Sequence, residues 1–286
     1  MNIVLGATGT NGREVVRALL GMGERVRAVV REPSQAVGVA DDRVEVVAGD
    51  LTQPESLERA LAGGSRLFLL VPVSLTQADM ELDALRAARA AGIGRVVKLS
   101  AIGADPLSRG HFSRAHGIAE AALRQSGVGW TIVRGAFFYS NLLFAANAIK
   151  GSDRYTGHWA EYPAAWVDPS DLAAVCARCM VDPGQAGVTL TATGPAALTN
   201  AEVCEALSRV LGRRITYVDQ PPKEYEQTLT AHGSPDWYAR AEVALGEVVR
   251  SGVAREVTAS SRVSRVARRG RSTSTSGQTR RPSLAE

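Results

Sequence analysis

Several features are missing from this 286-residue sequence, and each absence excludes a class of protein. No apolar run reaches the roughly 18 residues that a transmembrane helix needs, so a membrane protein is not expected. Three cysteines are too few for a disulfide framework, and Cys176 and Cys179 have the helical spacing of two buried thiols. The first residues contain no basic segment followed by a cleavable apolar stretch. Together these absences predict a cytoplasmic protein.

The small excess of positive charge lies at one end of the chain. The formal net charge is +4, yet residues 251–286 hold eight arginines and only two acidic residues. The rest of the chain is therefore slightly acidic, and nucleic acid is not expected as a partner. Few large apolar residues follow residue 257, so 258–286 is predicted to be a disordered basic tail rich in Ser and Arg.

Short segments rich in Val, Ile and Leu alternate with helical patterns through the first 135 residues. This alternation predicts an α/β protein with a Rossmann-type doubly wound parallel sheet. Strands are expected at 2–5, 25–30, 43–47, 66–71, 94–99 and 128–133, and helices at 11–22, 54–62, 76–91 and 112–126.

The alternation loosens in residues 136–257. Helices are expected there at 171–181, 199–211, 221–232 and 235–250, with strands near 187–193 and 214–218. Thr199 followed by Glu202 is a helix-capping pattern. We expect a small α+β lobe on the substrate side, interleaved with the core fold of residues 1–135.

Three glycines, Gly6, Gly9 and Gly12, lie between the first expected strand and the first expected helix. Glycine tolerates positive φ and has no Cβ, so the backbone can approach a diphosphate, which the first amides of the helix then face. A tight turn without a ligand is the alternative, but the strand before and the helix after favour a dinucleotide site. Thr8 and Arg13 are expected to contribute to it.

The end of the second expected strand selects the nicotinamide cofactor. Arg31 can pair with the 2′-phosphate of NADP, whereas an acidic residue such as the neighbouring Glu32 would suit the ribose of NAD. NADP(H) is therefore preferred and NAD(H) remains possible. Asp50 closes the third strand, where its carboxylate can reach the adenine amine or cap the next helix, and Leu51 belongs to the same cofactor site.

The sequence resembles the NmrA-like group of atypical short-chain dehydrogenase/reductases, which includes regulators, NAD(P)H:quinone oxidoreductases and triphenylmethane-dye reductases. The resemblance covers residues 1 to about 255 and is carried by "VLGATGTNGREVVRAL", "VVAGDL", "VVKLSAIGA", "HGIAEAALRQSGVGWTIVRGAFFYSNL", "VDPSDLAAV" and "TGPAALTNAEV". It implies a reductase that uses NAD(P)H, or a non-catalytic redox sensor that binds NADP(H) and acts through a protein partner. Pro72 is then expected beside the nicotinamide.

One departure from the wider superfamily concerns proton transfer. The resemblance implies a serine, a tyrosine and a lysine; Ser100 matches the serine, but Phe112 replaces the tyrosine and His116 the lysine. With an unperturbed pKa near 6.5, His116 is expected to donate a proton, directly or through water, or to hydrogen-bond the cofactor ribose. Loss of the tyrosine favours a quinone-like, conjugated aromatic or carbonyl acceptor over the substrates of an ordinary alcohol dehydrogenase.

An aromatic segment is expected to line the mouth of the active site. Its substrate-binding candidates are Phe137, Phe138, Tyr139 and Asn141, although aromatic packing in a core explains the two phenylalanines about as well. Arg134 precedes them. No histidine cluster indicates a metal, and no G-x-S-x-G indicates a hydrolase.

Overall fold

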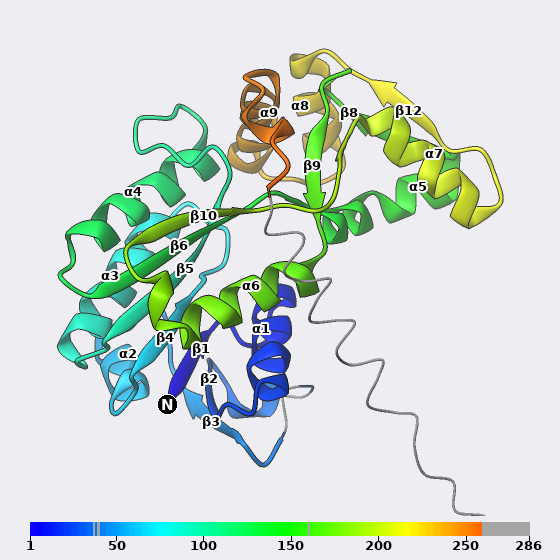
Figure 1. Ribbon diagram of the computed structural model, residues 1–286. Helices are drawn as coiled ribbons and strands as arrows, with labels where there is room; N and C mark the ends of the chain where they lie inside the picture. The colour runs from blue at the N-terminus through cyan, green and yellow to red at the C-terminus, as the bar shows by residue number, and fades with distance from the viewer. Residues whose placement is uncertain (37, 39–40, 160, 259–286) are drawn as a thin grey trace, which may run out of the picture.

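Seven parallel strands form the main sheet of the computed structural model, which describes residues 1–36, 38, 41–159 and 161–258 (Figure 1). The strand order is β10-β6-β5-β4-β1-β2-β3. β1 and β4 are neighbours although two strands separate them in the chain, so the strand order reverses between them. Rossmann folds bind their ligands at this switch point. The strands are β1 (Asn2–Leu5), β2 (Val26–Val30), β3 (Val44–Ala48), β4 (Arg66–Leu69), β5 (Arg95–Ala101), β6 (Gly129–Gly135) and β10 (Val188–Ala192).

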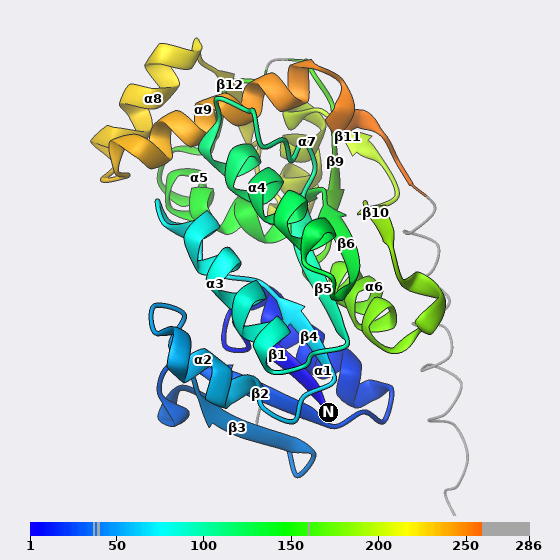
Figure 2. The same cartoon turned by 90° about the vertical axis from the view of Figure 1, so that its left-hand side faces the viewer.

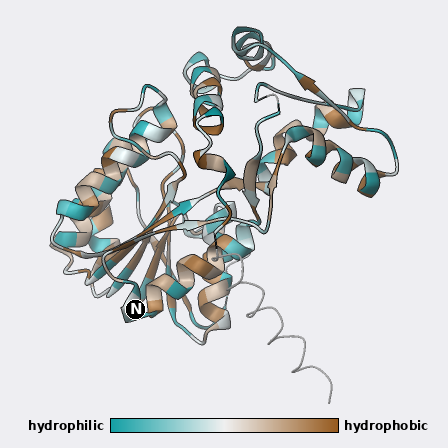
Figure 3. Ribbon diagram, turned by 45° about the horizontal axis from the view of Figure 1, so that its top comes forward, coloured by the Kyte–Doolittle hydropathy of each residue, from teal (hydrophilic) through white to brown (hydrophobic). Residues whose placement is uncertain are grey.

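Helices cover both faces of this sheet. α1 (Thr10–Gly21) and α6 (Pro169–Val181) pack on one face, while α2 (Pro54–Leu61), α3 (Gln77–Ala90) and α4 (His111–Gln125) pack on the other (Figure 2). Figure 3 shows the strands between them mostly in the brown of apolar residues, as expected for a sheet buried on both sides. Cys176 and Cys179 lie buried on α6 as free thiols, which confirms that interpretation of the C-x-x-C.

A smaller lobe lies above the carboxyl end of the sheet (Figure 1). It contains a three-stranded sheet, β11-β9-β7, and a two-stranded sheet, β12-β8. Its elements are β7 (Phe137–Phe138), α5 (Ala146–Ser152), β8 (Arg154–Gly157), β9 (Ala164–Val167), β11 (Ala197–Leu198), α7 (Asn200–Leu211), β12 (Thr216–Asp219), α8 (Pro222–Ala231) and α9 (Asp236–Arg250).

The chain passes between the two parts more than once. α6 and β10 fall within residues 136–257 but belong to the main sheet and its cover, whereas α7, α8 and α9 belong to the lobe. The predicted capping box of α7 is present, because Thr199 and Glu202 exchange side-chain to backbone hydrogen bonds. None of the helices in the described residues is long and apolar enough to cross a membrane. The predicted tail lies, from residue 259 on, outside the described residues.

Candidate cofactor and active site

The glycine turn joins β1 to α1 at the point where the strand order reverses. Gly6 has φ +69°, a conformation that residues with a Cβ rarely adopt. The amide of Gly9 donates to the carbonyl oxygen of Gly6 at 3.0 Å, which closes the turn. A Cβ on Gly12 would lie 2.0 Å from the same oxygen. Two of the three glycines are therefore required by the turn itself.

Gly9 has no comparable packing reason to be glycine. Its φ of −76° and ψ of 165° are open to any residue, and the nearest atom to an added Cβ is 3.4 Å away. Gly9 is also the N-cap of α1, and no side chain in the described structure caps that helix. A bare, exposed helix start of this kind leaves space and unpaired amides for an anion.

Two polar atoms beside the turn also lack partners. Within the described part of the chain, Asn11 Oδ1 and Arg13 Nε are buried without a hydrogen bond. Buried polar groups are nearly always paired, so a ligand at this turn would satisfy both. The residues present thus fit the diphosphate and ribose of a dinucleotide.

Arg31 and Asp50 approach each other at the carboxyl ends of β2 and β3. Arg31 is exposed, and its charge helps to lower the pKa of Asp50, although the hydrogen bonds from Thr52 contribute more. Asp50 Oδ1 accepts from the Thr52 amide at 2.9 Å and from its hydroxyl at 2.8 Å, so this carboxylate shapes the loop before α2. Leu51 packs on the core beneath α2.

Pro72 follows the buried Val71 after β4 and is itself exposed. The Leu70 carbonyl oxygen lies 3.0 Å from the position of a Cβ on Gly6, so the β4 connection and the glycine turn are neighbours. The next residues contact α4, since His111 Nε2 donates to the Ser74 carbonyl oxygen at 2.7 Å. Pro72 therefore lies on the sheet edge that carries the glycine turn.

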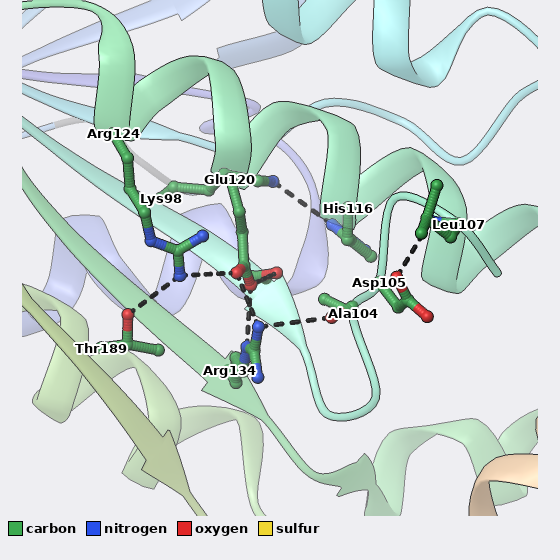
Figure 4. Close-up of polar contacts among 10 residues, drawn as sticks. Lys98, Ala104, Asp105, Leu107, His116, Glu120, Arg124, Arg134 and Thr189 are labelled. Carbon is green, nitrogen blue, oxygen red and sulfur yellow. Dashed lines mark hydrogen bonds and ion pairs between the residues drawn. The ribbon is translucent and has the colours of Figure 1, made fainter.

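Ser100 contacts a carboxylate rather than His116 (Figure 4 shows that carboxylate and its arginines). The Ser100 hydroxyl, on β5, donates to Glu120 Oε1 at 2.7 Å. Arg134 on β6 binds Glu120 through two hydrogen bonds of 2.7 and 2.9 Å, and Arg124 adds another of 2.9 Å. Burial alone would raise the pKa of Glu120. The hydrogen bonds from Arg134, Ser100 and Arg124 have the larger combined effect, so the pKa is lowered. Ser100 and Arg134 thus belong to one buried ionic network.

His116 contacts a second buried cluster, one turn earlier on α4. Its Nδ1 lies 3.2 Å from Lys98 Nζ, and Lys98 in turn donates to Glu81 Oε1 on α3 at 2.7 Å. Burial and the nearby ammonium lower the pKa of His116 well below 6.5. The expectation that this histidine keeps its unperturbed pKa is therefore wrong, and its role in the reaction remains a prediction.

The aromatic candidates pack into two different cores. Phe137 lies 4.6 Å from Trp159 between ring centroids, and Tyr139 stacks on Trp166 at 5.8 Å, both in the core of the lobe. Phe138 points instead toward the main core beside Gly135. Asn141, in the 3₁₀ helix Tyr139–Ala145, is exposed. The structure does not bring these four side chains together, and substrate contact by any of them stays a prediction.

Phe112, at the position of the missing tyrosine, takes part in an aromatic contact between α4 and α9. Its ring lies 6.5 Å from Trp237 and 5.5 Å from Tyr238, and His111 lies 5.3 Å from Trp237. Neither aromatic residue of α9 was predicted from the sequence as part of the site. Lys98 and Glu81 were not predicted either, although a lysine inside the apolar strand "RVVKLS" is a signal that a buried partner exists.

The strand order, the glycine turn and the covering lobe define a dinucleotide-binding Rossmann protein of the kind found among NAD(P)-dependent oxidoreductases. The chain belongs to the NmrA-like family, whose model matches residues 2–251.

Its relatives in sequence include two reductases. It is 35% identical over 241 residues to an NAD(P)H azoreductase of Xenophilus azovorans, covering 84% of each chain. It is 38% identical over 218 residues to a (4-alkanoyl-5-oxo-2,5-dihydrofuran-3-yl)methyl phosphate reductase of Streptomyces griseus, covering 76% of each. Among solved structures, the Citrobacter sp. triphenylmethane reductase complexed with NADP(H) matches with a TM-score of 0.81 at 25% identity, over 92% of this chain and 94% of that one.

Proposed function

We propose that this protein is an NAD(P)H-dependent reductase that prefers NADPH and reduces a quinone-like, conjugated aromatic or carbonyl small molecule. The observation that carries the proposal is the open corner at Gly9, beside the uncapped start of α1. Reductases of azo and triphenylmethane compounds among its relatives support the class of acceptor. The nicotinamide, when bound, supplies a hydride.

The residues of this chain bind and orient the two reactants. The amides at the start of α1 and the side chain of Arg13 would hold the diphosphate, and Arg31 would select the 2′-phosphate. Pro72, on the sheet edge that carries the glycine turn, would lie beside the nicotinamide. His116 provides a polar hydrogen to the acceptor, whose developing charge is delocalised in a conjugated system and requires less proton transfer than a ketone.

A redox sensor without catalytic activity is the second candidate. The observation that favours it is Phe112, which has no acidic proton to donate and whose ring packs against Trp237 and Tyr238 of α9. Such a protein would bind NADP(H) and signal through a protein partner. It would need no acceptor site.

Two measurements separate these functions. Titration of the protein with NADPH and NADH, followed by nucleotide fluorescence, gives both affinities. Absorbance at 340 nm then follows turnover with a panel of quinones, azo dyes and triphenylmethane dyes. We expect tighter binding of NADPH and turnover of at least one class of acceptor. Tight binding without turnover would favour the sensor, and binding of neither nucleotide would contradict both.

A further inference from the structure

Lys98 is a fully buried cation in the middle of β5. Its side chain and that of Glu81 are both 0% exposed. Its ammonium nitrogen lies 2.7 Å from Glu81 Oε1, 3.2 Å from the Leu99 carbonyl oxygen and 3.2 Å from His116 Nδ1. An ammonium group has three hydrogens and no lone pair, so three acceptors use all of its capacity. His116 Nδ1 is therefore an acceptor in this cluster.

The role of Nδ1 as an acceptor determines the protonation of the ring. A nitrogen that accepts from an ammonium carries no hydrogen, so the neutral ring has its hydrogen on Nε2. An imidazolium would place an N–H against the ammonium of Lys98. The Gln77 amide nitrogen on α3 lies 3.4 Å from Nε2 and 3.5 Å from Nδ1, but it can only donate, so it is not an acceptor for the Nε2 hydrogen.

The other charged groups around His116 do not supply a competing partner. Glu81 Oε1 lies 4.0 Å from Nδ1 but already accepts from Lys98, and burial raises the pKa of Glu81. Glu120, the next turn of α4, is bound by Arg134, Arg124 and Ser100. Of Lys98, Glu81 and His116, only His116 reaches the surface, with 13% of its side chain exposed.

We propose that Lys98, anchored by Glu81, is a positioning residue that holds His116 as a neutral imidazole with its hydrogen on Nε2. His116 then acts on the acceptor as a hydrogen-bond donor and not as an imidazolium acid. The part of this inference that concerns the acceptor rests on the proposed function, whereas the protonation of His116 does not. Lys98 on β5 thus sets the protonation of His116. In the wider superfamily, a tyrosine and a lysine on the helix at the position of α4 serve in proton transfer instead.

Nitrogen-detected NMR of protein labelled with ¹⁵N-histidine tests the inference without any nucleotide or acceptor. Between about pH 5.5 and 8, the range in which free histidine titrates, we expect His116 to remain neutral with its hydrogen on Nε2. His111, whose Nε2 donates to Ser74, is an internal reference for the same tautomer. An imidazolium signal of His116 near pH 6, or a hydrogen on Nδ1, would overturn the proposal.

A double variant, Lys98→Met with Glu81→Met, removes both buried charges and leaves no unpaired carboxylate. We expect His116 in this variant to populate both tautomers and to titrate closer to 6.5, and kcat to gain a pH dependence that the wild type lacks. An unchanged histidine spectrum in a variant that melts cooperatively would contradict a positioning role. If the variant does not fold, the wild-type spectra alone test the proposal.

A neutral His116 in a protein without turnover would contradict the proposed function and leave this inference intact.

Discussion

A Cβ on Gly12 would lie 2.0 Å from the carbonyl oxygen of Gly6, which already accepts the Gly9 amide. The start of α1 and the end of β1 are thus in backbone contact, and the turn cannot admit a side chain at Gly12. Gly12→Ala is expected to cost about 2 kcal/mol or more of unfolding free energy, because the helix must shift. Urea unfolding measures this loss. A variant as stable as the wild type would show that the turn is looser than described.

Substitution of Arg31 is expected to change the choice of nucleotide. Loss of a charge-assisted hydrogen bond costs about 1.5 to 3 kcal/mol, so Arg31→Gln should weaken NADPH about tenfold to a hundredfold. NADH lacks the 2′-phosphate, and its affinity should stay nearly the same. Arg25→Gln, another exposed arginine that lies just before β2, is the matched control. An equal loss of affinity for both nucleotides, measured by fluorescence titration, would show that Arg31 does not discriminate between NADPH and NADH.

The main sheet and its helices could be predicted because their signals are local. Each strand from β1 to β6 is a short apolar run, and the helices that follow β1, β3, β4 and β5 have an amphipathic spacing that appears within a few residues of sequence. The glycine turn is local as well. In the lobe, the strand expected near 214–218 is present as β12 (Thr216–Asp219), whereas β7 and β11 have two residues each and are too short for periodicity to reveal.

The partners of the polar residues could not be predicted, because they come from separate elements. Lys98 and Glu81 are 17 positions apart, and only the packing of α3 on β5 places their charges in contact. Ser100 was expected to act with His116, yet it binds Glu120, four residues further along α4. The unperturbed pKa assumed for His116 was wrong for the same reason, since spacing along the helix does not show the neighbouring lysine on the strand.

Glu120 is expected to stabilise the fold strongly. Glu120→Ala removes the carboxylate that accepts from Ser100, Arg134 and Arg124. Arg134 keeps the Ala104 carbonyl oxygen and Arg124 keeps Thr189 as an acceptor, but the buried Ser100 hydroxyl loses its partner. Leaving the buried Ser100 hydroxyl without its acceptor costs about 2 kcal/mol, and the ion pairs with two partly exposed arginines add less. Chemical denaturation provides the measurement. Glu202→Ala, which removes an exposed hydrogen-bonded carboxylate, is the control and should have a much smaller effect. Similar losses of unfolding free energy for both variants would mean that the hydrogen bonds of Glu120 do not stabilise the fold.

His158 should make the lobe sensitive to acid. Burial lowers the pKa of His158 to about 4, and its ring stacks on Tyr225 with a centroid distance of 4.5 Å. The unfolded chain, with a histidine pKa near 6.5, binds the proton first, so stability falls as the pH falls from about 6.5 to 4. The full loss is about 3 kcal/mol, with about 2 kcal/mol of it reached by pH 5.

Unfolding free energies at several pH values test this dependence. His158→Gln has no group to titrate and should lose less stability between neutral pH and pH 5 than the wild type, even if it is less stable at neutral pH. The exposed His232→Gln controls for the loss of a histidine. Parallel curves for the wild type and His158→Gln would show that His158 is protonated equally in both states.

The dissociation constant of NADPH for Gly9→Ala tests the central claim most directly, because Gly9 is the one glycine of the turn that the fold itself does not require. We predict a melting temperature close to that of the wild type and an affinity for NADPH at least tenfold weaker, the equivalent of about 1.4 kcal/mol. Unchanged affinity in the folded variant would mean that no diphosphate lies against the start of α1.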